Sequence, residues 1–394
     1  MEVTAHRRAG AGELVAYELP AGPIWLDIVR AHASSGASLL PIDPRLSAPE
    51  KRRLLGRAAP TVVVTPDGET LFPGQANVDP QTAWIVIATS GTGGEPRLVE
   101  LGRPAVGTAV TGSLDALGIS ASDPWVACLP PAHIGGLLVL LRGVLADAPL
   151  VIHERSDPDR LLAEAPMGAH VAMVPTMLVR LVAREVRLDA FGVLLVGGAA
   201  LDPGLRDAAT RLGARVVSTY GLTESCGGVA YDGVPFAGSE ARVDDADAVQ
   251  LRGPTLMDGY LADPQATAEA FTTDGWLRTQ DLGSIAGGRL VVDGRADDAI
   301  RTGGETVWPA EVERVLRSLP GIADVAVAGV ADEEWGQRVV AWVVPVDPNE
   351  PPVLDEIRAG AREHLASFKV PRDIRFVDEL PRTASGKVRR SALR

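Results

Sequence analysis

Residues 83–97 read AWIVIATSGTGGEPR, a short apolar run followed by a loop rich in glycine and hydroxyl side chains. The apolar run 83–88 is typical of a buried β-strand. The backbone N–H groups and hydroxyls of residues 89–94 can surround a phosphate, and Arg97 can add positive charge. No Lys-Ser/Thr pair follows the glycines, so the loop is not a GxxxxGK[ST] nucleotide loop. On this stretch alone a flexible glycine turn is an equally good interpretation.

The chain on both sides of this stretch alternates between short β-branched runs and segments with helical spacing. Such an alternation predicts parallel sheets covered by helices. The predicted strands are 61–65, 83–88, 150–152, 171–174, 193–196 and 215–219, and the predicted helices are 105–117, 137–146, 176–186 and 204–212.

The composition of the chain changes after Ser239, where glycine, aspartate and proline become frequent. Short strands at 248–251 and 290–292 predict a small antiparallel β subregion. From Arg295 onward a new order follows, with a helix at 309–319, strands at 324–330 and 339–344, a helix at 354–365 and a strand at 374–377. We therefore predict an α/β chain. Residues 1–296 form a large domain of parallel sheets with helices plus the small β subregion, with a shortened N-terminus, and 297–394 form a small, mobile α+β domain.

Composition excludes several classes of protein. The chain has 394 residues and a formal net charge of −13, which disfavours general nucleic-acid binding. It has two cysteines and no HxxxH or HxH cluster, which disfavours a disulfide framework and a histidine-rich metal site. No run reaches the ~18 apolar residues of a membrane span, and the N-terminus has no apolar signal-peptide core. We expect a cytoplasmic protein.

Three further stretches can carry chemistry. Residues 218–224 (STYGLTE) follow a predicted strand at 214–217, where ligands of open α/β sheets bind. Residues 275–283 (GWLRTQDLG), with GRADD at 294–298, offer a carboxylate that can hold a ribose and an arginine that can pair with phosphate. Residues 381–390 (PRTASGKVRR) place a lysine on a Ser-Gly turn. Taken singly, these stretches are more typical of an ordinary turn after a strand, of acidic turns between short strands and of a solvated basic tail.

Taken together and in this order, the four stretches resemble the adenylate-forming superfamily of acyl-CoA synthetases, adenylation domains and luciferases. Within it, four segments look most like the o-succinylbenzoate–CoA ligases of menaquinone synthesis. They are LPPAHIGGL at 129–137, VPT at 174–176, VGGAAL at 196–201 and TESCGGVAYDG at 223–233.

The resemblance implies two half-reactions that use ATP, Mg²⁺ and CoA. A carboxylate, expected to be o-succinylbenzoate, first attacks ATP to give acyl-AMP and diphosphate, and the CoA thiol then displaces AMP. Lys387 would bridge the carboxylate and the α-phosphate, Arg97 would support the phosphates, and Glu224 with Thr92 would serve Mg²⁺. His133 would contact the acyl side, with a buried helix-capping histidine as its alternative.

The resemblance also implies a nucleotide site. Asp281 would hold the ribose, and Arg295 would help to fix it. The small domain would rotate about Asp297 between the half-reactions and bring residues 303–305 to the active site. The residues expected at the phosphates and the adenine are Thr89, Ser90, Gly91, Thr92, Gly93, Gly94, Gly197, Gly198, Ala199, Thr219, Tyr220, Gly221 and Thr223.

Two positions depart from the family pattern. Arg97 stands where lysine is usual, and Gln280 stands where glycine is usual before the ribose aspartate. The first keeps the charge but changes its geometry, since a guanidinium is a planar fork and an ammonium is a point charge. The second shifts Asp281 in a direction that the sequence does not give.

Other interpretations stay open. The chain can be a ligase for another aryl or fatty acid, or a nonenzymatic relative that binds adenylates. A carrier-protein-loading domain is disfavoured because no carrier domain follows Arg394, although a carrier on a separate chain stays open. The second carboxylate of o-succinylbenzoate needs a cation or hydroxyl, which Arg142, Arg180 or Ser225 can supply. The sequence also leaves open a homodimer.

Overall fold

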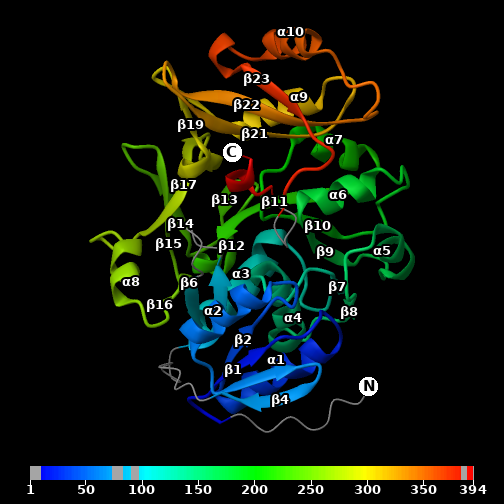
Figure 1. Ribbon diagram of the computed structural model, residues 1–394. Coiled ribbons are helices and arrows are strands. Elements are labelled where there is room, and N and C mark those ends of the chain that lie inside the picture. Colours follow the sequence, from blue (N-terminus) through cyan, green and yellow to red (C-terminus); the bar gives the residue numbers. More distant parts are fainter. Residues whose placement is uncertain (1–9, 73–82, 90–96, 383–387, 394) are drawn as a thin grey trace. The chain divides into compact units, whose positions relative to one another are not determined.

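The computed structural model describes residues 10–72, 83–89, 97–382 and 388–393, and the chain divides into two compact units (Figure 1). Unit 1 consists of Met1–Arg242, Gln250–Thr279 and Ala286–Leu290, and unit 2 of Val243–Val249, Gln280–Ile285 and Val291–Arg394. The segments of the two units interleave along the chain, so no single cut separates them. The boundary between residues 296 and 297 stays a prediction.

Unit 1 contains a first sheet that the N-terminal part of the chain builds. Its elements are β1 (Leu14–Tyr17), α1 (Ile24–Ser35), β2 (Ser38–Pro41), α2 (Ala48–Ala58), β3 (Val62–Thr65), β4 (Gly68–Leu71), β5 (Ala83–Thr89), β6 (Arg97–Gly102) and β16 (Gly259–Tyr260). The strand order is β16-β6-β5-β2-β1-β3-β4. Strand β1 pairs in parallel with β2 and β3, whereas β5 and β6 pair antiparallel. The sheet is therefore mixed, and its antiparallel edge carries the predicted phosphate loop.

The second sheet of unit 1 is parallel over most of its width. Its elements are α3 (Arg103–Leu117), β7 (Trp125–Ala127), α4 (Ile134–Leu145), β8 (Leu150–Ile152), α5 (Pro158–Glu164), β9 (His170–Met173), α6 (Pro175–Val182), β10 (Val193–Val196), α7 (Pro203–Arg211), β11 (Arg215–Leu222), β12 (Gly227–Tyr231) and β13 (Val234–Pro235). The order is β13-β12-β11-β10-β9-β7-β8, and the strands from β8 to β11 run parallel. All four residues of β10 are buried, as expected for a parallel strand covered on both faces.

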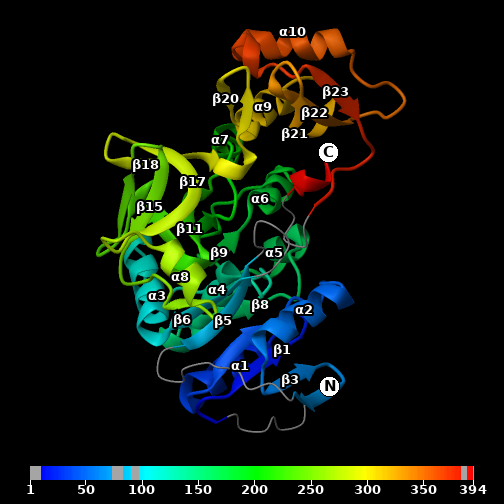
Figure 2. The same cartoon turned by 60° about the vertical axis from the view of Figure 1, so that its left-hand side comes forward.

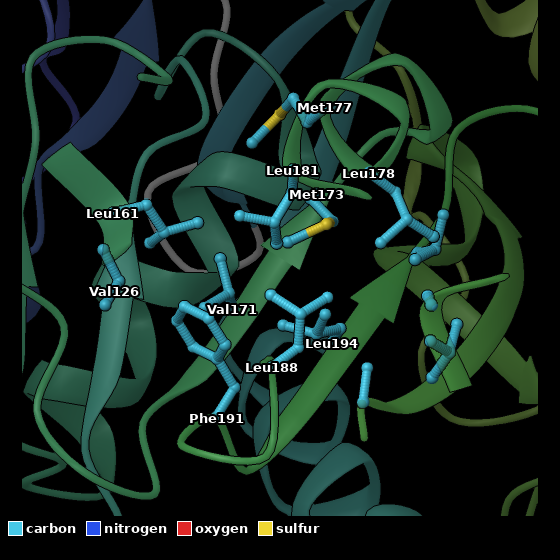
Figure 3. Packing of buried hydrophobic residues seen from close by; sticks show 14 of the residues in the cluster. Val126, Leu161, Val171, Met173, Met177, Leu178, Leu181, Leu188, Phe191 and Leu194 are labelled. Carbon is cyan, nitrogen blue, oxygen red and sulfur yellow. The ribbon is translucent and has the colours of Figure 1, made fainter. Parts of the chain in front are cut away.

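A hydrophobic cluster fixes this second sheet to its helices (Figure 3). Leu178 and Leu181 of α6 belong to it together with Val171 of β9 and Leu194 of β10, and all four are almost fully buried. Burying one leucine or valine side chain contributes roughly 1.5–3 kcal/mol. The cluster thus makes a rigid base for the carboxyl ends of β10 and β11, where two of the predicted site segments lie.

Strand β11 is longer than predicted. The sequence predicts a strand that ends between residues 217 and 219, but β11 continues to Leu222, because its second half pairs antiparallel with β12. The register shifts between Tyr220 and Gly221. A Cβ atom at Gly221 would lie 1.9 Å from the backbone oxygen of Gly227, so only glycine allows this approach. Residues 218–222 therefore lie on a strand, and Thr223 and Glu224 follow in a short 3₁₀-helix.

The small β subregion predicted after Ser239 is present. The short 3₁₀-helix η1 (Thr223–Ser225) precedes it in the chain. The subregion itself contains β14 (Glu240–Val243), β15 (Ala248–Arg252), α8 (Pro264–Ala270), β17 (Leu277–Ala286) and β18 (Arg289–Arg295). Four of these form a sheet in the order β14-β15-β17-β18. None of the helices in the described part of the chain combines the length and the apolar character that a bilayer span requires.

Unit 2 has its own sheet and core. Its elements are η2 (Ala296–Asp298), β19 (Ile300–Thr302), β20 (Glu305–Val307), α9 (Pro309–Arg317), β21 (Ile322–Asp332), β22 (Gly336–Pro345), α10 (Leu354–His364), η3 (Ser367–Lys369), β23 (Asp373–Phe376) and η4 (Arg390–Ala392). The order is β20-β19-β22-β21, with β23 beside β22. Helices α9 and α10 lie on one side of β21 and β22 (Figure 2), and their side chains cluster with that face of the two strands, whereas side chains of the C-terminal segment cluster with the other face. The predicted succession of helix, two strands, helix and strand is confirmed.

Candidate active site

The two ends of the predicted phosphate loop lie side by side on antiparallel strands. Thr89 is the last residue of β5, Arg97 is the first of β6, and the two are register partners. The hydroxyl of Thr89 donates a hydrogen bond to the backbone oxygen of Arg97 over 3.5 Å. The strands therefore fix where the loop leaves the sheet and where it returns. The other predicted loop residues lie outside the described residues, namely Ser90, Gly91, Thr92, Gly93 and Gly94.

Glu224, the predicted magnesium ligand, lies in η1 directly after β11 and is half-buried. The phenol of Tyr260 donates a hydrogen bond to Oε1 of Glu224 over 3.0 Å. The guanidinium of Arg97 lies over the same ring, 5.1 Å from its centroid. Three segments far apart in sequence thus bring a carboxylate, a phenol and a guanidinium together in unit 1.

Tyr260 is a site residue that the sequence analysis missed. It follows a Gly-Asp-rich stretch and is 36 residues from Glu224, so no local spacing connects the two. Burial raises the pKa of Tyr260 to about 12, the carboxylate of Glu224 acts in the same direction, and Arg97 opposes both. The phenol is therefore protonated at neutral pH and acts as the donor to Glu224.

The surroundings of Glu224 fit a magnesium ion that arrives with a nucleotide. No group of three or more His, Cys, Asp or Glu side chains among the described residues can hold a metal ion by itself. Magnesium usually keeps several water ligands and binds through one or two carboxylates plus the phosphates of its substrate. A single carboxylate near Arg97, where the predicted phosphate loop returns to the sheet, meets that requirement. Thr92, the other predicted ligand, lies outside the described residues.

The structure brings together the two segments predicted to line the adenine. Val196 at the end of β10 pairs with Ser218 of β11, so the segment of Gly197, Gly198 and Ala199 follows β10 beside Thr219. A Cβ atom at Gly197 would lie 2.7 Å from Cγ2 of Thr219. The remaining predicted residues, Tyr220, Gly221 and Thr223, continue along β11 into η1. Their contact with adenine stays a prediction.

The two remaining nucleotide residues belong to unit 2. Asp281 is buried on β17, and its contact with a ribose stays a prediction. Arg295, at the end of β18, donates a hydrogen bond to Oε1 of Gln280, and its Nη2 lies 3.9 Å from Oδ2 of Asp297. The departure at Gln280 thus supplies an acceptor for Arg295 that a glycine would lack.

His133 stands at the start of α4 but does not cap it. Its side chain makes no capping hydrogen bond, and 44% of it is exposed, so the alternative of a buried helix-capping histidine is wrong. Its Nε2 lies 3.8 Å from Oδ2 of Asp43. Burial acts to raise the pKa of Asp43, but two hydrogen bonds from the Arg45 guanidinium and one from its backbone N–H hold it below its usual value. Asp43 thus presents a fixed negative charge to His133.

Lys387 lies outside the described residues, but the chain on both sides of it is anchored in unit 2. Arg382 and Val388 form an antiparallel bridge. The guanidinium of Arg390, in η4, donates to Oε1 of Glu313 over 2.6 Å and to Oδ2 of Asp298 over 3.3 Å. The two ends of the predicted lysine loop are thus fixed.

Comparison with known proteins gives two family matches and several similar sequences. The family described as AMP-binding enzyme matches residues 71–261, and the AMP-binding enzyme C-terminal domain matches residues 311–387. A probable 2-succinylbenzoate–CoA ligase of Mycobacterium tuberculosis is 36% identical over 366 residues, which cover 88% of this chain and 94% of the relative. An indoleacetate–CoA ligase of Aromatoleum aromaticum is 33% identical over 449 residues, covering 96% and 87%.

A solved structure shares the fold. The o-succinylbenzoate CoA synthetase of Bacillus subtilis, in complex with its acyl-adenylate intermediate, superposes with a TM-score of 0.88 and 26% identity. The match covers 98% of this chain and 89% of the synthetase. Another structure of the same synthetase contains ATP and a magnesium ion.

Proposed function

We propose, from the premise that this chain belongs to the AMP-binding enzymes and is an AMP-forming acid–CoA ligase, that its acid is 2-succinylbenzoate. Family membership follows from 36% identity over 94% of a relative and confirms the resemblance drawn from the motifs. The reaction joins the acid to CoA through acyl-AMP and releases AMP and diphosphate. Acting on this acid, the enzyme would serve menaquinone synthesis.

The observation that carries the choice of acid is a fully buried cation, Arg142 on α4. Its side chain is 2% exposed, its guanidinium lies 4.3 Å from the ring centroid of Trp125, and Nη2 donates to Oγ of Ser113 over 2.9 Å. Among the described residues no hydrogen-bond partner reaches its Nε. A buried guanidinium without a carboxylate partner is costly, and the second carboxylate of a dicarboxylic substrate would offset that cost.

Arg142 lies close to the chain that follows Glu224. Burial lowers its pKa, while Tyr231 and Cys226 act in the opposite direction, so both groups are near the guanidinium. Cys226 stands two residues after Glu224 and belongs to the Cys-Gly-Gly segment that supported the resemblance. The cation is thus within the part of unit 1 where the acid is expected.

The other two candidates for the second carboxylate are less suitable. Arg180 on α6 is exposed. The hydroxyl of Ser225 already accepts from the backbone N–H of Leu222 and lies within hydrogen-bond distance of the Leu222 and Gly227 oxygens. The Ser225 hydroxyl thus bonds the backbone on both sides of η1 and has little hydrogen-bonding capacity left for a substrate.

The second candidate function is a ligase for an aryl acid with one carboxylate. It is favoured by the 33% identity to the indoleacetate–CoA ligase over 96% of this chain. Such an acid would leave Arg142 without a carboxylate partner. A diphosphate-release assay with 2-succinylbenzoate, indoleacetate, benzoates and fatty acids, each with and without CoA, separates the candidates. We expect the largest kcat/KM for 2-succinylbenzoate, and a higher value for a monocarboxylic acid would refute the proposal.

Substitution of Arg142 tests the role of the buried cation. In Arg142→Met we expect kcat/KM for 2-succinylbenzoate to fall roughly 10- to 100-fold, the size of a lost hydrogen bond to a charged group. The kcat/KM for a weak monocarboxylic substrate should stay close to wild type. Arg180→Met, which removes an exposed arginine, is the matched control. An equal fall for both acids, together with a lower melting temperature, would assign Arg142 a purely structural role.

The proposed mechanism distributes the first half-reaction over the predicted residues. Lys387 bridges the attacking carboxylate and the α-phosphate, and Arg97 supports the phosphates at the end of β5 and β6. Asp281 holds the ribose, and the segments after β10 and along β11 hold the adenine. Glu224 and Thr92 would hold a magnesium ion, which neutralises charge on the phosphates. Positioning and charge neutralisation are the main demands of this step.

Glu224→Gln tests the magnesium site. The amide keeps the shape but loses the negative charge, so we expect the magnesium concentration for half-maximal diphosphate release to rise several-fold and turnover to slow. Glu269→Gln, on the exposed surface of α8, is the matched control. An unchanged magnesium titration in a folded Glu224→Gln protein would mean that the carboxylate only accepts the hydrogen bond of Tyr260.

Location and assembly are also proposals. Both cysteines are free and buried, which is consistent with the cytoplasm that we propose. For assembly we expect a monomer or a homodimer, and size-exclusion chromatography with light scattering distinguishes the two.

A further inference from the structure

Arg97, Glu224 and Tyr260 form a cluster in which a ring separates two opposite charges. The phenol of Tyr260 binds one oxygen of Glu224, and its ring lies beneath the guanidinium of Arg97. Among the contacts of the described residues, Arg97 and Glu224 form no ion pair with each other. One tyrosine side chain thus contacts both charged groups.

The backbone holds Tyr260 independently of these two partners. Strand β16 pairs antiparallel with β6, with Tyr260 opposite Val99. The N–H of Leu261 donates to the oxygen of Leu98 over 2.8 Å, and the N–H of Tyr260 donates to Oγ1 of Thr267 over 2.9 Å. The side chain is 6% exposed. The backbone contacts therefore fix the position of the phenol without help from Glu224 or Arg97.

We propose that Tyr260 is a positioning residue that holds the Glu224 carboxylate for magnesium and the Arg97 guanidinium for the nucleotide phosphates, and prevents the two from neutralising each other. The proposal rests on the proposed function of the site. Hydrogen bonding to Oε1 leaves Oε2 to other ligands, so the carboxylate keeps one orientation. Without the tyrosine, a carboxylate and a guanidinium that contact the same side chain could pair with each other, and the nucleotide would have to break that pair.

The cluster also accounts for the departure at position 97. A guanidinium is planar, stacks on aromatic faces and is weakly hydrated, whereas an ammonium is a strongly hydrated point charge. Cation–π contacts with tyrosine therefore suit arginine at this position. In this chain the ring of Tyr260 fixes the arginine where most of the family has lysine.

Two substitutions separate the functions of the hydroxyl and the ring. Tyr260→Phe removes the hydrogen bond to Glu224 and keeps the ring under Arg97. Tyr260→Leu removes both. Tyr17→Phe is the matched control, since it deletes another buried phenol hydroxyl in unit 1, one bonded to His32 over 3.0 Å. Circular dichroism and melting temperature show that each variant is folded.

Calorimetry with a nonhydrolysable probe, adenosine 5′-(α,β-methylene)triphosphate, measures the effect without catalysis. The quantity of interest is the factor by which magnesium strengthens binding of the probe. In Tyr260→Phe we expect this factor to fall roughly tenfold, the size of one hydrogen bond to a charged group, with magnesium-free affinity unchanged. In Tyr260→Leu we expect magnesium-free affinity to fall as well, roughly threefold. Tyr17→Phe should match wild type in both measurements.

The kinetics give a second, independent readout. Tyr260→Phe should lower kcat for acyl-AMP formation without changing the KM of the acid. A magnesium factor within twofold of wild type in folded Tyr260→Phe would overturn the proposal, and so would an equal loss with and without magnesium. No acid is present in the calorimetry, so inactivity toward 2-succinylbenzoate would refute only the proposed substrate. Wild-type protein that binds the probe without any magnesium effect would overturn both.

Discussion

Lys387→Ala should lose acyl-AMP formation by at least roughly 100-fold and should keep most of its ability to make thioester from supplied acyl-AMP. In the first step a carboxylate approaches a phosphate that carries like charge, so a cation that bridges the two acts mainly in the transition state. Removing one such group typically costs 10²- to 10³-fold in rate. In the second step the α-phosphate is already bonded to the acyl group, so the bridge is no longer needed.

Two assays separate these steps. Diphosphate release from ATP and the acid reports the first, and acyl-CoA formation from synthetic acyl-AMP and CoA reports the second. Lys369→Ala is the matched control, because that ammonium pairs with Glu311 within unit 2 at 2.7 Å. Equal losses in both assays would show that Lys387 serves both steps or the fold.

Asp297→Pro should produce the opposite separation. Proline fixes φ near −65°, and it also disfavours the helical region for the residue before it, so a hinge that must change its backbone angles would be locked. Residue 297 lies in the middle of η2, where a φ of this value is compatible, but Ala296 before it is also in η2, so a small loss of stability should accompany the substitution. We therefore expect diphosphate release in the first turnover and then a stall, with acyl-AMP retained on the enzyme and acyl-CoA formation slowed at least roughly 100-fold.

Rapid-quench measurement of diphosphate, acyl-AMP and acyl-CoA over the first turnovers tests this result. Asp297→Ala removes the same carboxylate and leaves the backbone free, so it should retain both steps. A folded Asp297→Pro protein that forms acyl-CoA at the wild-type rate would place the hinge elsewhere. A protein that loses both steps and its circular dichroism signal would show that the substitution unfolds the chain.

Elements with a strong local pattern could be predicted closely from the sequence. The runs at 150–152 and 193–196 are found unchanged as β8 and β10, because a short apolar run bounded by turn residues has few alternatives in a parallel sheet. The first part of the chain was not predicted. Strands β1 and β2 are four residues each, and their burial depends on neighbours that come later in the sequence.

The candidate site likewise contains residues that could be predicted from the sequence and residues that could not. Motifs in which several residues of one segment act together, such as 89–97 and 218–224, could be recognised directly. Tyr260 could not, because its role depends on the pairing of β16 with β6, which joins residues about 160 positions apart. Likewise, the sequence named Arg142 only as one of three candidates, and its burial against Trp125 separates it from the others.

Arg390 ties several segments of unit 2 to one another through a single side chain. One guanidinium joins η4, three residues after Lys387, to Asp298 beside the proposed hinge, and to Glu313 on α9. It also donates to the backbone oxygen of Val327 on β21 over 3.1 Å. Segments that share several hydrogen bonds to one side chain are expected to move together as one rigid body. If residue 297 is the hinge, we expect a change of its backbone angles to move the segment that follows Lys387 together with α9 and β21, so that weakening the Arg390 bonds would slow the passage from the first half-reaction to the second.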